Sequence, residues 1–136
     1  MTFARKGQRR RYSDDLVRRL DAACAERECR RIFIARDADG RAHAGAYLVW
    51  DEHSAYYLMG GIDPEVRGSG AMSLCMWYAI RFAANVAPRF DFEGSMLEPI
   101  ERFFRSFGAQ QLPYFTVTRT VSRIMRAGEA IRYVFV

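Results

Sequence analysis

A glycine-rich segment at residues 65–70, with the sequence EVRGSG, carries the residue types best suited to binding a phosphate group. Gly68 and Gly70 have no Cβ, so the backbone N–H groups of residues 67–71 can approach and converge on a diphosphate. A predicted helix follows, and its dipole favours a negative charge at this end. Arg67 can add a positive charge to the site. An ordinary loop, in which the glycines only provide positive φ angles, is the alternative interpretation.

The hydrophobic pattern around this segment predicts one α/β domain at residues 13–136, preceded by a basic arm at residues 1–12. Three strands joined by short turns should form an antiparallel meander. A right-handed crossover through a long helix should place the fourth strand parallel to the third, giving a mixed sheet with helices on both faces. The predicted elements are a helix at 14–28, strands at 31–36, 41–50 and 54–61, a helix at 69–87, a strand at 89–93, a helix at 99–107, a strand at 112–118, a helix near 121–128 and a tail at 131–136.

Local signals define the first two helices. Ser13 is a good N-cap for the helix at 14–28, and two acidic residues follow it at the positive end of the helix dipole. The helix at 69–87 is apolar around nearly its whole circumference, apart from a narrow polar stripe. A helix of this kind is expected to be buried on most of its sides.

The third helix, at 99–107, has two competing starts. Ser95 and Glu98 have the spacing of a capping box. Alternatively, Glu98 is the cap and Pro99 occupies the first helical position, where its missing N–H costs nothing. Gly108 is suited to end the helix with a positive φ angle.

Composition limits the class of protein. The chain has 136 residues, of which 50% are hydrophobic, enough for one domain with a core. No apolar run approaches the roughly 20 residues of a membrane span, and the N-terminus lacks the apolar core of a secretory signal. The three cysteines have no metal-ligand spacing, so we expect no metal site and reduced thiols in a cytoplasmic protein.

The net charge of +5 comes from the N-terminal arm. The first eleven residues hold five bases and no acid, whereas residues 12–136 hold 16 bases and 16 acids. The folded body is therefore neutral. A solvated tail and a nucleic-acid contact both fit such an arm.

Residues 65–70 resemble the acyl-CoA-binding motif of the GNAT superfamily of N-acyltransferases. That motif is commonly Gln or Arg, two residues, Gly, one residue, then Gly or Ala, and Glu65, Gly68 and Gly70 stand at its three fixed places. The order of the predicted elements also matches the superfamily. More narrowly, FDFEGS followed by IERFFRSFGA resembles the branch of Fem-type peptidoglycan-bridge aminoacyltransferases and their acetyltransferase-like relatives. The resemblance covers roughly residues 30–118.

Three features depart from these families. Glu65 replaces the usual Gln or Arg and puts an acid near the expected diphosphate. Phe104 stands where many Fem-type members have Lys, so phosphate or tRNA contacts of that lysine do not carry over. The chain is also about half the length of such members and looks like their C-terminal domain alone, which would leave the acceptor cleft incomplete.

The resemblance also implies where catalysis occurs. In GNAT-like folds the third strand and its parallel neighbour splay apart, which exposes backbone N–H groups near Met59, Gly60 and Gly61 as candidates to bind the oxyanion and the pantetheine arm. Acyl transfer to an amine also needs a base. Glu93 is the candidate base, with Ser95 nearby, and a structural cap or ion pair is the alternative role for Glu93. The cofactor-binding candidates in the loop are Val66, Arg67, Gly68, Ser69, Gly70 and Ala71.

Other polar residues have a structural role as their default. Tyr56 and Tyr57 could serve as acids, but packing is the alternative for both. Asp91 should share a face of its strand with Glu93. His43 and His53 lie in the predicted hairpins and are expected to be surface residues.

We therefore expect a GNAT-like N-acyltransferase that uses acetyl-CoA or another acyl-CoA, with aminoacyl-tRNA as an alternative donor. The acceptor would be an amine on a small molecule or a peptidoglycan precursor. One alternative is a catalytically silent binding or scaffolding domain, half of a two-domain enzyme, and another is an RNA-contacting module that uses the arm. The strand at 31–36 would have an unpaired apolar edge, which favours a homodimer.

Overall fold

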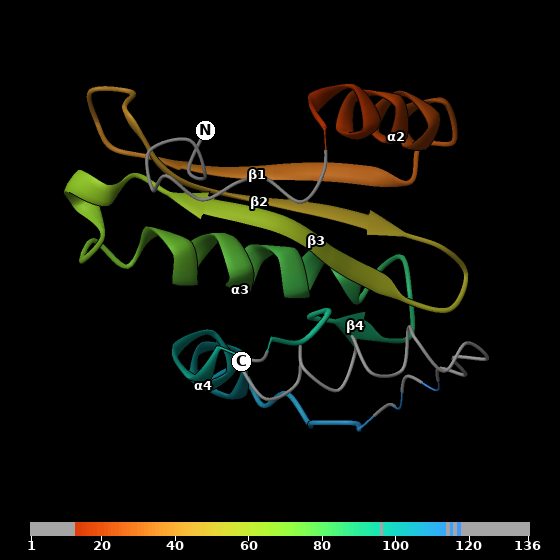
Figure 1. Cartoon of the computed structure of the whole chain (residues 1–136). Coiled ribbons are helices and arrows are strands. Elements are labelled where there is room, and N and C mark those ends of the chain that lie inside the picture. The colour runs from red at the N-terminus through yellow and green to blue at the C-terminus, as the bar shows by residue number, and fades with distance from the viewer. Residues whose placement is uncertain (1–12, 96, 114, 116, 118–136) are drawn as a thin grey trace, which may run out of the picture.

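The computed structural model describes residues 13–95, 97–113, 115 and 117 of the chain (Figure 1). The basic arm, the helix expected near 121–128 and the tail at 131–136 lie outside the described residues. The described elements, in chain order, are α2 (Asp14–Glu26), β1 (Arg30–Arg36), β2 (Ala42–Trp50), β3 (Ala55–Ile62), the short 3₁₀ helix η1 (Pro64–Val66), α3 (Ala71–Ala83), β4 (Phe90–Asp91) and α4 (Glu98–Arg105).

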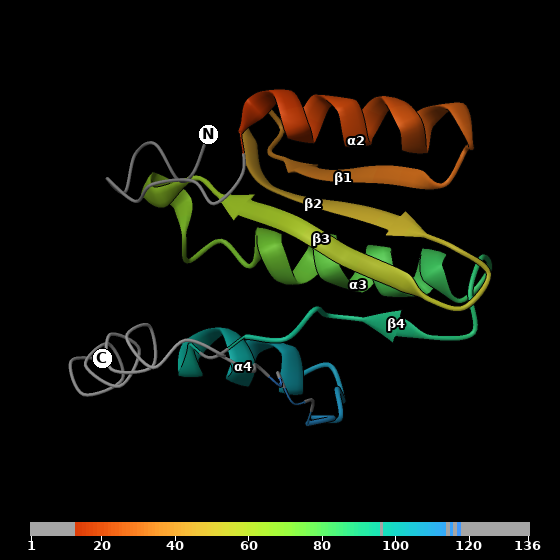
Figure 2. The same ribbon diagram turned by 45° about the vertical axis from the view of Figure 1, so that its right-hand side comes forward.

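The four strands form one mixed sheet with the order β1-β2-β3-β4. The first three pair antiparallel, and β4 pairs parallel with β3. The predicted meander and the parallel placement of the fourth strand beside the third are therefore confirmed. Figures 1 and 2 show α2 beside β1 at one side of the molecule, α3 alongside the sheet, and α4 beyond β4.

Strand alternation places α2 and α3 on opposite faces of the sheet. Phe33 of β1 packs towards α3, whereas its neighbour Ile32 pairs in register with Tyr47, whose hydroxyl donates to Asp21 of α2. Successive side chains of a strand point to opposite faces, so the two helices cover opposite faces. The predicted arrangement of helices on both faces is confirmed.

The core lies between the sheet and one side of α3. The buried residues of α3 recur at helical spacing and are mostly small, namely Ala71, Cys75, Met76, Ala79 and Ala83. They meet alanines and Leu48 on the inner face of β2. Small side chains allow the helix axis to approach the sheet closely, which fixes the position of the α3 N-terminus relative to β3.

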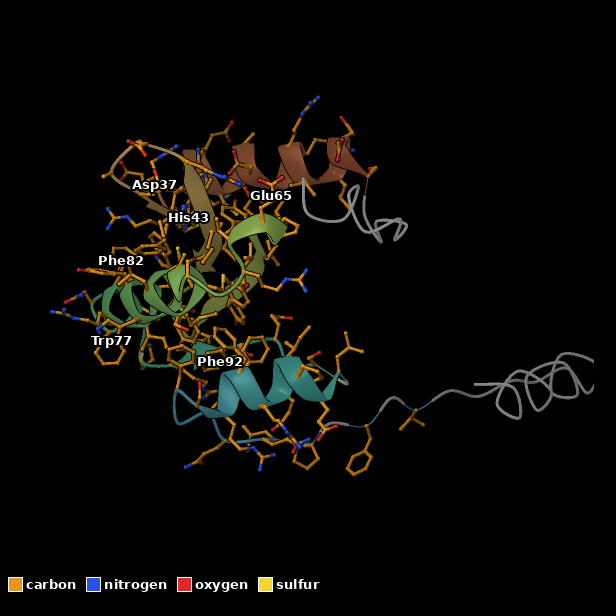
Figure 3. The ribbon with its side chains drawn as sticks, turned by 90° about the vertical axis from the view of Figure 1, so that its left-hand side faces the viewer. Asp37, His43, Glu65, Trp77, Phe82 and Phe92 are labelled. Carbon is orange, nitrogen blue, oxygen red and sulfur yellow. The ribbon has the colours of Figure 1, made fainter. Side chains whose placement is uncertain are left out.

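The opposite side of α3 faces outward, so the prediction that this helix is buried on most of its sides is wrong. Leu74, Trp77 and Tyr78 are each about half exposed, and Figure 3 shows Trp77 pointing away from the sheet. The helix packs on the sheet through one face only. The apolar residues on its outer side led to the wrong prediction of burial, because apolar side chains can also lie exposed at the surface of a folded protein.

The described helices are shorter than predicted. The helix from Asp14 ends at Glu26, with Ser13 as the N-cap that accepts the Leu16 N–H, as expected. The next helix begins at Ala71, because Gly70 has φ +72° and cannot continue a right-handed helix. It ends at Ala83, where Asn85 donates its amide to two of the last carbonyls.

Both predicted starts of the third helix are wrong. Leu97 is the N-cap of α4, and Pro99 lies in the first turn. The hydroxyl of Ser95 accepts the Leu97 N–H at 3.1 Å and forms a turn before the helix. Gly108 has φ +84° just beyond the helix, as expected.

The fourth strand is shorter than the predicted residues 89–93, since Glu93 and Gly94 have φ angles of +61° and +69° that turn the chain away. The described members of the predicted strand at 112–118, which are residues 112, 113, 115 and 117, belong to no strand. In the described part of the chain, no helix is both long enough and apolar enough to cross a bilayer.

We predict that Leu48→Ala lowers the free energy of unfolding by about 2–5 kcal/mol, because Leu48 is 0% exposed and its removal leaves a cavity. Leu74→Ala is the matched control, since the same change at a side chain that is 51% exposed should cost less than about 1 kcal/mol. Urea denaturation of both variants measures the difference. Equal losses would show that the core lies elsewhere.

Candidate functional site

The sheet has an open edge next to β4. The parallel pairing joins Ala55 with Phe90 and Tyr56 with Asp91, and no further pair follows. Beyond Tyr56, the β4 side of β3 therefore has no strand neighbour among the described residues. Backbone N–H and C=O groups on this edge are available to another extended molecule.

The ladder with β2 shows which residues of β3 present their backbone to this edge. The Asp63 N–H donates to the His43 carbonyl of β2 at 2.8 Å. Backbone groups in an antiparallel ladder alternate in direction, so Met59 and Gly61 point towards β2, whereas Gly60 points to the open edge. Met59, Gly60 and Gly61 were all expected to expose their N–H groups, but only Gly60 directs its N–H to the open edge of β3.

Gly60 also lies against a tyrosine hydroxyl. A Cβ at this position would lie 1.9 Å from the Tyr57 hydroxyl oxygen and 2.7 Å from Met72 Cε. Tyr57 thus packs on Gly60 in a way that only glycine permits. Burial raises the pKa of Tyr57 to about 12, so the phenol stays protonated at neutral pH.

The Tyr57 hydroxyl differs from the other tyrosine hydroxyls that the structure describes near the sheet. Tyr47 donates to Asp21, and Tyr56 donates to Asp51. Tyr57 has no acceptor within the described residues. Tyr56 therefore has a structural role, and Tyr57 has a proton that it can donate to a bound molecule.

The glycine-rich loop continues directly from β3. Gly70 caps α3 in the left-handed conformation without any side-chain hydrogen bond. A Cβ on Gly68 or Gly70 would meet nothing within 4 Å. Among the described residues, the N–H groups of Gly68 and Gly70 have no acceptor, whereas the Ser69 N–H bonds to the Val66 carbonyl. The loop therefore has the free N–H groups and the open space that a phosphate requires.

An ion-pair network holds the start of this loop. The Arg41 guanidinium lies 2.7 Å from the Asp63 carboxylate and 2.6 Å from the Glu65 carboxylate. Both bonds raise the pKa of Arg41. The Glu65 carboxylate, labelled in Figure 3, is thus paired with a cation of the β1–β2 hairpin. Glu65 therefore adds no unpaired acid beside the loop.

The segment after β4 is anchored by an aromatic cluster. Phe92 has its ring centroid 4.7 Å from that of Phe90 and 5.0 Å from that of Phe104 (Figure 3). Phe104 is buried and also contacts Tyr57 edge-on at 5.9 Å. This position, where Fem-type proteins often have Lys, is therefore part of the core.

The acidic residues of this segment have different environments. Asp91 Oδ1 accepts the Glu93 N–H at 2.7 Å and stabilises the turn. Glu93 itself is exposed, and its carboxylate has no partner among the described residues. The Ser95 hydroxyl already accepts the Leu97 N–H. The Glu93 carboxylate is therefore accessible to a bound molecule, and Ser95 has a structural role.

The two histidines differ in their burial. His53 is exposed, as expected. His43, at the start of β2, is less exposed than His53, and its Nε2 lies 2.9 Å from Asp37 Oδ2 (Figure 3). This hydrogen bond is the main cause that lowers the pKa of Asp37. Within the described residues, no group of three or more His, Cys, Asp and Glu side chains could hold a metal ion.

Sequence inspection identified the loop but missed Arg41. This residue is 22 and 24 positions before its two carboxylate partners. Only the register of β2 against β3 brings them together, and that register contains an irregularity between Tyr47 and Leu48. An Arg at the end of a hairpin gives no local signal of such a contact.

Comparison with known proteins agrees with this architecture. A family model described as an acetyltransferase (GNAT) domain matches residues 1–113. No curated protein matches the chain. Among solved structures, AAC(6′)-Iy in complex with the bisubstrate analogue CoA-S-monomethyl-acetylneamine is 17% identical with a TM-score of 0.65, covering 87% of each chain.

Two further solved structures share the fold. A putative acetyl transferase from Pyrococcus furiosus is 12% identical, with a TM-score of 0.62 and 87% of each chain covered. The aminoglycoside 6′-N-acetyltransferase AAC(6′)-Ih from Acinetobacter baumannii is 14% identical, with a TM-score of 0.59, and the match covers 81% of this chain and 84% of that one. The chain thus spans most of the length of these structures. Together with the family match, the mixed sheet and its glycine-rich loop show that the chain belongs to the GNAT acetyltransferase domain family.

Proposed function

We propose that this protein is an N-acyltransferase that transfers the acyl group of acetyl-CoA, or of another acyl-CoA, to an amine of a small molecule. The observation that carries this proposal is the continuity of the open β3 edge with the glycine-rich loop. Gly60 presents its backbone at the edge, and ten residues later Gly70 caps α3 with a free N–H group. One extended ligand with a diphosphate at one end fits both features.

The loop and the edge have separate roles in donor binding. The N–H groups of Gly68 and Gly70, with the α3 dipole and the exposed Arg67, would hold the diphosphate. The Gly60 carbonyl would accept an amide N–H of the pantetheine arm, as it would from a neighbouring strand. When bound, acyl-CoA supplies a thioester carbonyl that an amine can attack.

Three groups of the chain can then assist the transfer. The acceptor nitrogen attacks the thioester carbon, and Glu93 takes the proton that this nitrogen loses. The Gly60 N–H stabilises the negative charge that develops on the carbonyl oxygen. As the C–S bond breaks, the protonated Tyr57 donates its proton to the leaving sulfur. The products are the amide and free CoA, and solvent returns the proton from Glu93 to Tyr57.

One buried residue bears on the choice of acyl donor, and the fold neighbours suggest which acceptors to assay. Phe104 is buried in the aromatic cluster, so this position offers no cationic contact for an aminoacyl-tRNA, and we favour acyl-CoA. The aminoglycosides acetylated by two of the fold neighbours are suitable first acceptors to assay, beside simple diamines and amino-acid precursors of peptidoglycan. CoA binding without turnover of any amine would favour the alternative of a silent binding domain.

We predict that Gly68→Val abolishes CoA binding while the melting temperature stays close to that of the parent. A side chain here would fill the space where the diphosphate approaches, although it meets nothing in the protein itself. Gly68 is a cleaner test than Gly70, whose φ of +72° would strain any other residue. Isothermal titration with CoA gives the dissociation constant. Ala38→Val, in the exposed β1–β2 turn, is the control, and equal CoA affinity of all three proteins would place the site elsewhere.

A second prediction concerns the charge balance of the loop. Arg41→Gln should remove the cation that is paired with Glu65 and weaken CoA binding roughly tenfold, as expected for one exposed charge acting over several ångströms. Adding Glu65→Gln to this variant should restore part of the affinity. The effect should shrink at high ionic strength and should be absent for pantetheine, which has no diphosphate. Equal losses for CoA and pantetheine would indicate a general distortion of the loop.

The third prediction tests the base. Glu93→Gln keeps the shape of the side chain but removes its basicity, so turnover should fall by roughly 10²–10⁴ with unchanged CoA affinity. Glu26→Gln, on the exposed last turn of α2, is the matched control. An unchanged rate at neutral pH for Glu93→Gln would eliminate the proposed proton transfer.

We also propose that two copies associate through β1. This strand is at the end of the sheet order, and Ile32 and Ile34 on it are 52% and 51% exposed. A two-fold axis at Phe33 would set Ile32 of one copy opposite Ile34 of the other and continue the sheet.

The expected result is a mass of about twice 15.7 kDa in sedimentation at micromolar concentration. Ile34→Lys should give a monomer with an unchanged fold, because a charged side chain disfavours pairing at an edge. Arg36→Lys, further along the same strand, is the control that retains the dimer. A monomeric parent protein would disprove the association.

A further inference from the structure

The end of α2 brings two cysteines together. The Cys29 N–H donates to the Cys24 carbonyl, and the Glu28 N–H donates to the Ala25 carbonyl, both at 3.0 Å. Glu28 has φ +52° between them. These bonds and this left-handed residue define a Schellman motif, in which the side chains three residues before the cap and two residues after it meet. Here that contact is made by Cys24 and Cys29.

The two cysteine side chains are close neighbours. The Cys29 thiol lies 3.5 Å from the Cys24 carbonyl oxygen. Burial, together with the charge and hydrogen bond of the neighbouring Cys29 thiol, raises the pKa of the Cys24 thiol. Disulfides join α-carbons that are about 4.4–6.8 Å apart, and the 3.0 Å bond from the Cys29 N–H to the Cys24 carbonyl holds the two backbones beside each other. The pair is therefore a candidate for a disulfide bond.

We propose that Cys24 and Cys29 form a reversible oxidation site, which glutathione disulfide or a peroxide converts to an intramolecular disulfide. With glutathione disulfide, the Cys29 thiolate attacks one sulfur and releases one glutathione. The Cys24 sulfur then attacks the Cys29 sulfur of the mixed disulfide and releases the second glutathione. Each thiol gives up one proton, and each released glutathione takes one up. The protein dithiol loses two electrons to the oxidant.

The order of these steps follows from the environment of Cys24. Its raised pKa lowers the fraction of thiolate at neutral pH, so Cys24 is the slower thiol to attack an external disulfide. Once Cys29 has been modified, the Schellman contact holds the Cys24 sulfur beside it. Cys29 is therefore assigned the first attack and Cys24 the resolving step.

Oxidation would add a covalent link at the C-terminal end of α2, a helix that makes few contacts with the sheet. Within α2 no residue is buried. Its described polar contacts with the sheet converge on Asp21, which accepts the Tyr47 hydroxyl at 3.0 Å and lies 3.0 Å from the Arg30 guanidinium. A covalent bond between the last turn of α2 and the residue before β1 would limit the opening of this helix end. Amide exchange in residues 22–27 should slow on oxidation.

The third cysteine provides an internal control. Cys75 is 3% exposed and donates its thiol towards the Ala44 and Phe33 carbonyls. It has no second thiol nearby in the described structure. Under the same conditions it should remain reduced.

The experiment equilibrates the full chain with a series of glutathione to glutathione disulfide ratios, then alkylates free thiols and digests with trypsin. Cleavage after Arg27 separates the Cys24 peptide, residues 20–27, from the Cys29 peptide, residues 28–30. The disulfide is therefore detected as two linked peptides with the mass of both less two hydrogens. We expect this linked pair to rise with the oxidised fraction of the buffer and to disappear on reduction, while Cys75 stays alkylated.

Two variants test the assigned order. Cys24→Ser should accumulate a glutathione adduct on Cys29, because the resolving thiol is absent. Cys29→Ser should form much less adduct on Cys24. Alkylation of both thiols of the parent protein at the most oxidising ratio would overturn the proposal, as would linkage of either thiol to Cys75. Slower amide exchange in α2 of the oxidised parent, but not of Cys24→Ser, would support the proposed stabilisation of the α2 C-terminus by the disulfide.

Discussion

The divergence of β3 and β4 after two paired residues is the constraint on which the rest of the site depends. A longer ladder would satisfy the edge of β3 internally and leave no backbone for a ligand. The pairing stops because Glu93 and Gly94 adopt left-handed φ angles directly after β4. Such a conformation is costly for Glu, and the bond from its N–H to the Asp91 carboxylate stabilises it. Phe92, packed between Phe90 and Phe104, anchors the segment at this point.

A second constraint is electrostatic. A loop that binds a diphosphate should carry little negative charge, yet Asp63 and Glu65 lie at its start. Asp63 is useful there because its carboxylate accepts the Glu65 N–H and caps the 3₁₀ turn. Arg41 offsets both acids from the neighbouring hairpin. The loop thus retains its turn geometry, and Arg67, which has no acidic partner in the described part of the chain, and the α3 dipole are the positive features beside the glycines.

The order of elements could be predicted from the sequence because it depends on local signals. The alternating hydrophobic pattern of the strands, the short turns and the glycines that precede α3 can each be recognised from a few consecutive residues. The missed features depend on contacts between distant segments. The orientation of Gly60 follows from the register between β2 and β3, in which Ala46 is opposite Gly60.

The same limit applies to the helices. The outward face of α3 could not be separated from its buried face, because both are apolar. The start of α4 depended on a turn made by Ser95 that competes with its role as a cap. In each case a residue had two locally acceptable roles, and tertiary packing selected one of them.

The proposed acid and base differ in environment, and this difference assigns their roles. Tyr57 is largely buried between Gly60, Met72 and Phe104, and its pKa of about 12 keeps the proton on the phenol throughout the neutral range. Glu93 is exposed on a turn and is free to accept a proton. A buried phenol that keeps its proton and an exposed carboxyl group without a described partner are suited to opposite roles in one reaction. Because Gly60 lies against Tyr57, the proposed oxyanion donor and the proposed acid are held by the same packing contact, so the geometry of β3 positions both together.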